Sequence, residues 1–137
     1  MSVDTPIDTV YPAGLPTPEE MPGWFMRLGV RARQGGFVDV LWGRVVGCCA
    51  LGAVYMYKTK WMQRGDAREL QCITDDETRR AILRLTPDED LGIVMGFDGE
   101  SALPPEGASP EFRSGYAWGA AVWSECVAAG VAAAPRS

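Results

Sequence analysis

Residues 47–55 read Gly-Cys-Cys-Ala-Leu-Gly-Ala-Val-Tyr, a run in which small residues outnumber large apolar ones. On a helix, Cys48 and Gly52 lie one turn apart on the same face. A stripe of small side chains lets another helix approach closely, with large side chains interlocking beside it. The run therefore predicts a helix over residues 47–60 that packs tightly against a second helix.

The best partner for that helix lies near the C-terminus, over residues 110–131. Gly115 and Gly119 are four positions apart there, as are Cys126 and Gly130. Because both segments carry small residues at one-turn spacing, we expect them to pack on each other. The predicted packing positions are Gly52, Cys48, Gly115 and Gly119.

Four helix starts are visible along the chain, because a Thr or Ser cap is followed by acidic residues and often by Pro at the first helical position. These sequences are Thr17-Pro18-Glu19-Glu20, Thr74-Asp75-Asp76-Glu77, Thr86-Pro87-Asp88-Glu89 and Ser109-Pro110-Glu111. They predict helices that begin near residues 18, 75, 87 and 110.

Glycines and apolar spacing indicate how these helices end. The first should stop at Gly35-Gly36, and residues 75–85 should form an amphipathic surface helix. The piece 87–91 reads as a single turn closed by Gly92, and 93–97 is ambiguous between a buried strand and an extended link. The expected fold class is mainly α, a small domain of about four to five helices with little or no sheet.

Residues 1–18 contain Pro6, Pro12, Pro16 and Pro18, which leaves no room for a regular element. We therefore expect an extended N-terminal arm, followed by a single helical domain over residues 19–134. The length of 137 residues suits one domain with one core.

The N-terminus lacks the basic and apolar regions of a secretory signal, which predicts a cytoplasmic protein whose four cysteines are reduced. Their expected role is that of small core residues. The longest apolar run, Val45 to Tyr57, spans about 13 residues, below the ~20 that a membrane-spanning helix needs. No membrane association is expected.

The net charge of −5 is unevenly distributed. Residues 1–20 carry −4, residues 21–84 carry +5 and residues 85–137 carry −6. This asymmetry fits a basic face that meets an acidic partner. It fits equally well a chain whose halves neutralise each other within one domain or across a dimer.

Catalytic chemistry is poorly supported. The chain has no histidine, which removes Ser-His and Cys-His pairs, and its only cysteine pair is vicinal, unlike the spaced pairs of zinc sites. Cys48 or Cys49 could act as a nucleophile only beside a cation or a helix N-terminus. Carboxylates such as Asp98 and Glu111 could pair for acid–base work, or belong to a solvated turn. We predict no enzymatic activity, no metal and no cofactor.

The segment Lys58–Arg68 mixes bases with Trp61 and is the best candidate for nucleic-acid contact. The negative charge of the whole chain argues against that function, and a solvated basic face with Trp61 folded onto the core is the alternative. We therefore expect a protein partner or a homo-oligomer rather than a nucleic acid.

Five tryptophans in 137 residues are many, and Trp is enriched at the centres of binding surfaces. Trp118 and Trp123 lie about 140° apart on one helix, so a buried Trp123 would leave Trp118 partly exposed. A binding surface or cover by the 102–109 loop would explain that exposure. The predicted interaction residues are Trp118, Trp61, Trp24 and Asp98.

The Cys49-Ala50-Leu51-Gly52-Ala53 segment, the helix Glu77–Leu85, the Gly96-Phe97-Asp98-Gly99 loop and a final helix follow one another in an order that resembles small uncharacterised proteins of actinobacteria and their phages. The resemblance spans residues 45–127 and departs at Phe97-Asp98, where a Trp-Asn-Asp-like sequence is expected. It implies only a helical domain of phage or phage-derived origin, because the family carries no activity that could be transferred to this chain.

The resulting hypothesis is a non-enzymatic binding or interaction protein, an accessory protein of a phage or mobile element that acts in the host cytoplasm through a protein partner or self-association. Two alternatives remain open. One is a structural component of a larger assembly such as a virion, tethered by the arm. The other is a small-ligand binder that uses the loop around Asp98.

Overall fold

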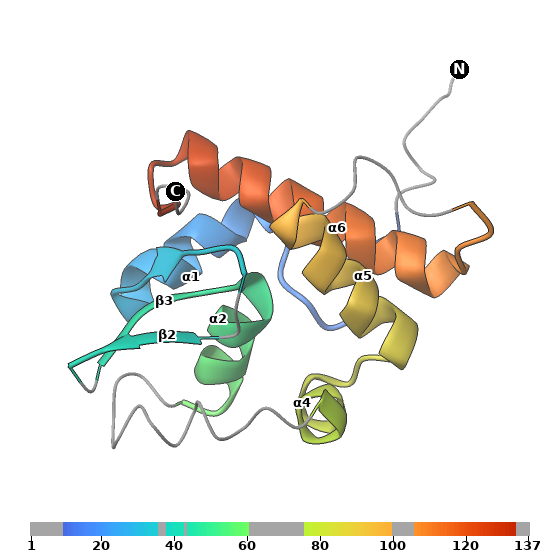
Figure 1. The fold of residues 1–137 in the computed structure, drawn as a ribbon, viewed down its shortest axis with the longest axis horizontal. Helices are drawn as coiled ribbons and strands as arrows, with labels where there is room; N and C mark the ends of the chain where they lie inside the picture. Colours follow the sequence, from blue (N-terminus) through green and yellow to red (C-terminus); the bar gives the residue numbers. More distant parts are fainter. Residues whose placement is uncertain (1–9, 36–37, 43, 61–75, 100–105, 134–137) are drawn as a thin grey trace.

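The computed structural model describes residues 10–35, 38–42, 44–60, 76–99 and 106–133 (Figure 1). Their elements follow in this order: η3 Pro18–Glu20, α1 Met21–Leu28, β1 Arg31–Ala32, β2 Val38–Leu41, β3 Arg44–Cys48, α2 Ala50–Lys58, α4 Asp76–Leu83, α5 Pro87–Asp98 and α6 Pro110–Ala128. The long helix α6 runs along one side of the molecule, with α5 beside it (Figure 1).

A three-stranded mixed sheet lies at one end of the molecule, with strand order β1-β3-β2 (Figure 1). Strand β3 is the central strand, parallel to β1 and antiparallel to β2. The C-terminal segment extends the pairing, because Ala32 also bridges Ala132. The expected mainly α fold with little or no sheet is therefore wrong: the described residues form a mixed α and β fold.

The sheet also shortens the helix expected over residues 47–60. Gly47 and Cys48 pair with β1 on one side and β2 on the other. Hydrogen bonds along both edges favour the extended backbone there, whatever the helical spacing of the small residues indicates. The helix α2 starts only at Ala50, and Cys48, predicted as a helix-packing residue, belongs to a strand.

The helix α5 is continuous through Gly92, where we expected a helical turn to end, and through Gly96. Thr86 forms the predicted capping box with Glu89, which confirms the helix start. The single turn over 87–91 and the separate 93–97 segment are wrong, because the helix ends only at Gly99, with φ 67°. Glycine lowers helix propensity by ~1 kcal/mol, and packing against α6 offsets that loss.

Packing of α5 on α6 explains these glycines. A Cβ at Gly92 or Gly96 would overlap the backbone carbonyl of Phe112 or Tyr116 on α6. Gly92 meets Phe112, and Gly96, one turn later, meets Tyr116, which also lies one turn later. Because the contacts move towards the C-terminus of both helices, α5 and α6 run parallel. Glycines four residues apart on each helix thus allow direct backbone contact.

The other half of this contact comes from α6. A Cβ at Gly115 would overlap the carbonyl oxygen of Glu89, and one at Gly119 would overlap that of Ile93. The two predicted packing glycines therefore do mediate a close helix contact. We expected them to pack on the helix over residues 47–60. That prediction is wrong, because the backbone that they contact is that of α5.

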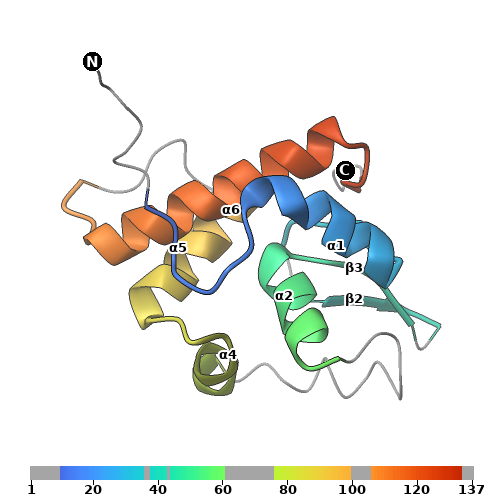
Figure 2. The ribbon, with the colours of Figure 1, turned by 180° about the vertical axis from the view of Figure 1, so that it is seen from behind.

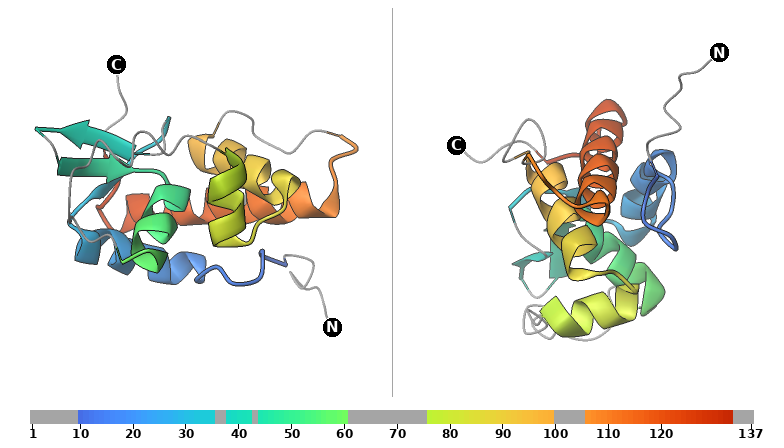
Figure 3. Two further views of the ribbon diagram at one scale, coloured as in Figure 1. Left: turned by 90° about the horizontal axis from the view of Figure 1, so that it is seen from below. Right: turned by 90° about the vertical axis from the view of Figure 1, so that its right-hand side faces the viewer.

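The first helix ends earlier than expected. Gly29 caps α1 with φ 71°, so the chain enters β1 before the predicted stop at Gly35-Gly36. Helices α1 and α2 lie on the same side of the sheet (Figure 3). The core fills the space between these helices, the sheet and α6, and its largest fully buried side chains include Trp118, Phe25, Phe97, Met21, Leu51 and Met56.

The described part of the predicted arm runs alongside α6 before it enters η3 and α1 (Figure 2). Pro12 and Pro18 are buried, and Leu15 packs against the core. The carbonyl oxygen of Pro16 accepts a hydrogen bond of 2.7 Å from Nε1 of Trp118. Residues 10–18 thus make specific contacts with the folded domain, although the described residues before Met21, 10–20, contain no strand or α-helix.

Candidate functional site

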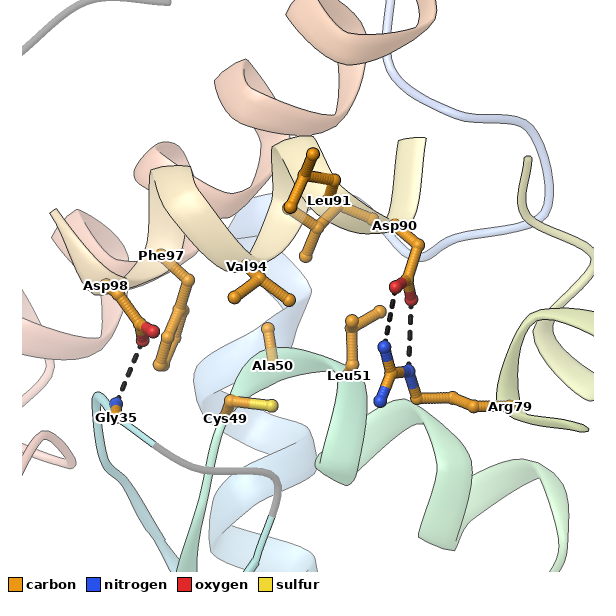
Figure 4. A pocket seen from close by; sticks show the side chains of 11 residues that line it. Gly35, Cys49, Ala50, Leu51, Arg79, Asp90, Leu91, Val94, Phe97 and Asp98 are labelled. Carbon is orange, nitrogen blue, oxygen red and sulfur yellow. Dashed lines mark hydrogen bonds and ion pairs between the residues drawn. The ribbon is translucent and has the colours of Figure 1, made fainter. Parts of the chain in front are cut away.

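A pocket of about 310 Å³ opens between α5 and the start of α2 (Figure 4). Its centre is apolar, with Val94 and Leu91 of α5 facing Ala50 and Leu51 of α2 (Figure 4). Charged side chains occupy its two ends. The full lining consists of Gly35, Cys49, Ala50, Leu51, Arg79, Asp90, Leu91, Ile93, Val94, Phe97 and Asp98.

The α2 wall of the pocket begins where β3 leads directly into that helix. Cys49 is the N-cap, with extended backbone, and its Sγ accepts a hydrogen bond of 3.4 Å from the backbone N–H of Gly52. This thiol takes the place of the Ser, Thr or Asp usually found at such a cap. The cap holds Cys49, Ala50 and Leu51 against the pocket.

A buried ion pair closes one end of the pocket. Arg79 of α4 donates from Nε to Oδ1 of Asp90 over 3.0 Å and from Nη2 to Oδ2 over 2.5 Å. The two residues are only 8% and 5% exposed. A bidentate pair of this kind fixes geometry and neutralises both charges. It joins α4 to α5 and leaves this end of the pocket polar and electrically neutral.

Asp98 lies at the opposite end, as the last residue of α5. Its Oδ1 accepts a hydrogen bond of 3.0 Å from the backbone N–H of Gly35. Next to it, Nε2 of Gln34 donates to the carbonyl oxygen of Phe97 over 2.8 Å. These two bonds attach the 34–35 turn to the carboxyl end of α5 and shape this end of the pocket.

The thiol in the pocket is poorly suited to nucleophilic attack. Burial raises the pKa of Cys49 to about 11, against partial lowering by the hydrogen bond from Gly52. Burial raises the pKa of Cys126 to about 12 and lifts that of Cys48 well above its usual range. All three groups are free thiols and stay protonated at neutral pH, whereas nucleophilic attack requires the thiolate.

The predicted interaction residues are scattered rather than gathered at one site. Asp98 lines the pocket. Trp118 is fully buried, so the expectation that it would be partly exposed is wrong. The half-buried Trp24 packs against Tyr57 with ring centroids 4.3 Å apart and the rings tilted by 33°. Trp61 lies outside the described residues.

The burial of Trp118 has a physical cause that helix geometry alone could not supply. Trp123 is half-buried instead, and its ring packs against that of Phe97 in a T-shaped arrangement with centroids 5.3 Å apart. Trp118 can be buried because Pro16 offers its indole N–H a hydrogen-bond acceptor.

The other predicted packing residue, Gly52, is buried within α2.

Sequence analysis missed the Arg79–Asp90 pair and the exposed Trp42. The pair joins two helices that are adjacent in sequence, and an acidic residue in the first turn of α5 opposite the basic residues of α4 was the available signal. Trp42 is followed by Gly43, and a glycine between two segments that contain valines was the available sign of a turn. Trp42 is 92% exposed, with φ 53°.

Within the described ranges, no three His, Cys, Asp or Glu residues gather closely enough to hold a metal ion. None of the helices in those ranges is both long and apolar enough to cross a bilayer. Comparison with protein-family models, with curated proteins and with solved structures found no match.

Proposed function

We propose that this protein is a non-enzymatic binding protein and that the pocket between α2 and α5 takes a small ligand. The observation that carries the proposal is the lining: an apolar centre between two polar ends, walled by packed helices. Ligand sites combine such apolar walls with a few fixed polar groups that orient the ligand. The volume of about 310 Å³ lies at the lower end of the usual range, which suits a compact molecule.

Binding rather than catalysis is supported by the state of the polar groups. Arg79 and Asp90 are engaged with each other, and burial keeps the Cys49 thiol protonated. A ligand would therefore meet fixed polar groups and an apolar surface rather than an activated nucleophile. The free thiols at Cys48, Cys49 and Cys126 support a cytoplasmic location.

Fragment screening by NMR tests this proposal. Compounds that bind should shift the amide signals of Gly35, Leu51 and Val94, which surround the pocket. Val94→Phe fills the pocket from a half-buried position and should weaken binding at least about tenfold, ~1.4 kcal/mol. Val127→Phe adds the same ring at an exposed position of α6 and should leave binding unchanged. A screen in which no compound shifts these amides, or in which Val94→Phe binds as well as the wild type, would refute the proposal.

Association with a protein partner or a second copy is a second candidate function, favoured by the β2–β3 hairpin tip. Leu41 is 54% exposed and Trp42 is 92% exposed. Trp42 also has a φ of 53°, a backbone conformation that L-residues rarely adopt. Large aromatic side chains held in this way are typical anchors of interfaces.

Light scattering and sedimentation of the wild type and of Trp42→Ser test this second function. If the hairpin tip mediates self-association, the wild type should form dimers or larger species that Trp42→Ser loses. Met26→Ser, which changes another exposed apolar side chain on α1, is the control and should behave as the wild type. A monomeric wild type at high concentration would exclude self-association through this tip.

A further inference from the structure

We infer that the ligand of the α2–α5 pocket is a small organic cation, an amine or a similar base with an apolar body, whose charged group pairs with Asp98. This inference rests on the proposed function and concerns the same pocket. It identifies the chemical class of the ligand from the charges, hydrogen bonds and apolar surface around it.

The charges of the pocket lining do not cancel. Arg79 and Asp90 neutralise each other through a bidentate pair. Among the described lining residues, Asp98 is then the one remaining charged side chain, and the lining carries a net charge of −1. A ligand with one positive charge would make the loaded pocket neutral.

The hydrogen bonds of Asp98 leave room for that ligand. Gly35 donates to Oδ1 alone. A carboxylate offers two oxygens with about four lone-pair sites, so a ligand N–H can be accepted while the bond to Gly35 is kept. A charge-assisted hydrogen bond from an ammonium group is among the stronger kinds available.

The position of Asp98 on α5 adds a second attraction for a cation. The carboxyl end of a helix carries partial negative charge, so an acidic residue there is unfavourable. The last turn of α5 contains no basic residue. A bound cation would interact favourably with both the carboxylate and the helix end, and would relieve the repulsion between them.

The middle of the pocket selects for an apolar body. Val94 and Leu91 on one wall face Ala50 and Leu51 on the other, in the space that leads away from Asp98 (Figure 4). Burying apolar ligand surface here removes it from water and contributes favourably to binding. The amino end of α2 also borders the pocket and favours anions, but the N–H of Gly52 is already bonded to Cys49. The experiment must therefore include an anion.

Three matched probes separate the possibilities: benzylamine, benzyl alcohol and benzoate share one ring and differ in charge. Each is titrated into the full chain while the amide signals of Gly35, Leu51 and Val94 are followed. We expect benzylamine to bind at least about tenfold more tightly than either of the others, ~1.4 kcal/mol.

Asp98→Asn is the matched variant, because its side-chain oxygen can still accept from Gly35 while the charge is gone. It should lower the affinity for benzylamine by about tenfold and leave that for benzyl alcohol unchanged. Added salt should weaken benzylamine binding to the wild type more than to the variant.

Each outcome is decisive. Tighter binding of benzoate or benzyl alcohol, or unchanged benzylamine affinity in Asp98→Asn, would overturn the cation inference while the pocket remained a binding site. If benzylamine fails to shift the pocket amides although other fragments do, the cation inference is again wrong and the proposed function stands. If neither the probes nor the fragment screen shifts those amides, the cation inference and the proposed function are both wrong.

Discussion

The indole Nε1 of Trp118 donates a hydrogen bond of 2.7 Å to the carbonyl oxygen of Pro16, across 102 residues of chain. Trp118 is fully buried and lies near the middle of α6, and Pro16 lies in the Pro-rich segment before η3. The bond satisfies a polar group that would otherwise be buried without an acceptor. It thereby ties the described part of the arm to the core.

Trp118→Phe should destabilise the protein by about 1–3 kcal/mol, because the ring largely remains while the Pro16 carbonyl loses its donor. Urea unfolding followed by circular dichroism measures the loss. Trp123→Phe changes a half-buried indole on the same helix and should cost less. An equal loss in the two variants would mean that the bond to Pro16 contributes little.

Removal of residues 10–16 should lower stability as well. A chain that begins at Thr17 lacks the buried Pro12, the contact of Leu15 with the core and the acceptor for Trp118. Compared with a chain that begins at Val10, its melting temperature should fall by several degrees, as expected for a loss of about 1–2 kcal/mol. Trp118→Phe should then cost less in the shorter chain, because the two changes remove the same bond. Equal melting temperatures would show that this segment is dispensable for folding.

Gly96→Ala should destabilise the protein by about 1–3 kcal/mol or more, because its methyl group would overlap the Tyr116 carbonyl and force α5 from α6. Gly23→Ala is the control, since Gly23 lies in the first turn of α1 and a Cβ there meets nothing within 4 Å. That change should stabilise the helix by roughly 0.5–1 kcal/mol. Chemical unfolding of the two variants should therefore give shifts of opposite sign, and shifts of the same sign would contradict the backbone contact.

Asp90→Asn should cost about 3–5 kcal/mol, because it removes the carboxylate that pairs with the buried guanidinium of Arg79. Asp39→Asn removes an ion pair with Arg33 whose side chains are 27–30% exposed, and should cost less than about 1 kcal/mol. Replacing both Arg79 and Asp90 by apolar residues should recover part of the loss. Denaturant titration would contradict the assignment if Asp90→Asn were as mild as Asp39→Asn.

Alkaline pH should destabilise the protein through its buried thiols. The pKa of Cys126 rises from 9.0 to about 12 on folding, so the unfolded chain releases that proton first. Stability is unaffected by this group below about pH 9 and falls as the pH rises from 9 towards 12, by on the order of 1–2 kcal/mol near pH 10.5. Cys126→Ala should show a shallower fall in unfolding free energy over this range. Identical slopes would show that the thiol is not buried as described.

The sequence by itself determined where helices α5 and α6 begin. The caps at Thr86 and Ser109 accept hydrogen bonds from the backbone N–H groups of Glu89 and Phe112, at the helix starts that the sequence predicts. These interactions join residues three positions apart, so the residue types and their spacing are enough. The close packing of Gly115 and Gly119 also follows from their spacing, although the identity of the partner does not.

Only the tertiary structure decided the rest, because the deciding partners are distant in the chain. Hydrogen bonds from β1 and β2 make Gly47 and Cys48 a strand despite their helical spacing. The backbone of α6 offsets the weak helix propensity of Gly92 and Gly96, and Pro16 permits Trp118 to be buried. The pocket arises in the same way, since Arg79, Asp98 and Cys49 come from three separate segments. Local spacing reports the preferences of a segment, whereas burial and backbone pairing depend on which segments meet.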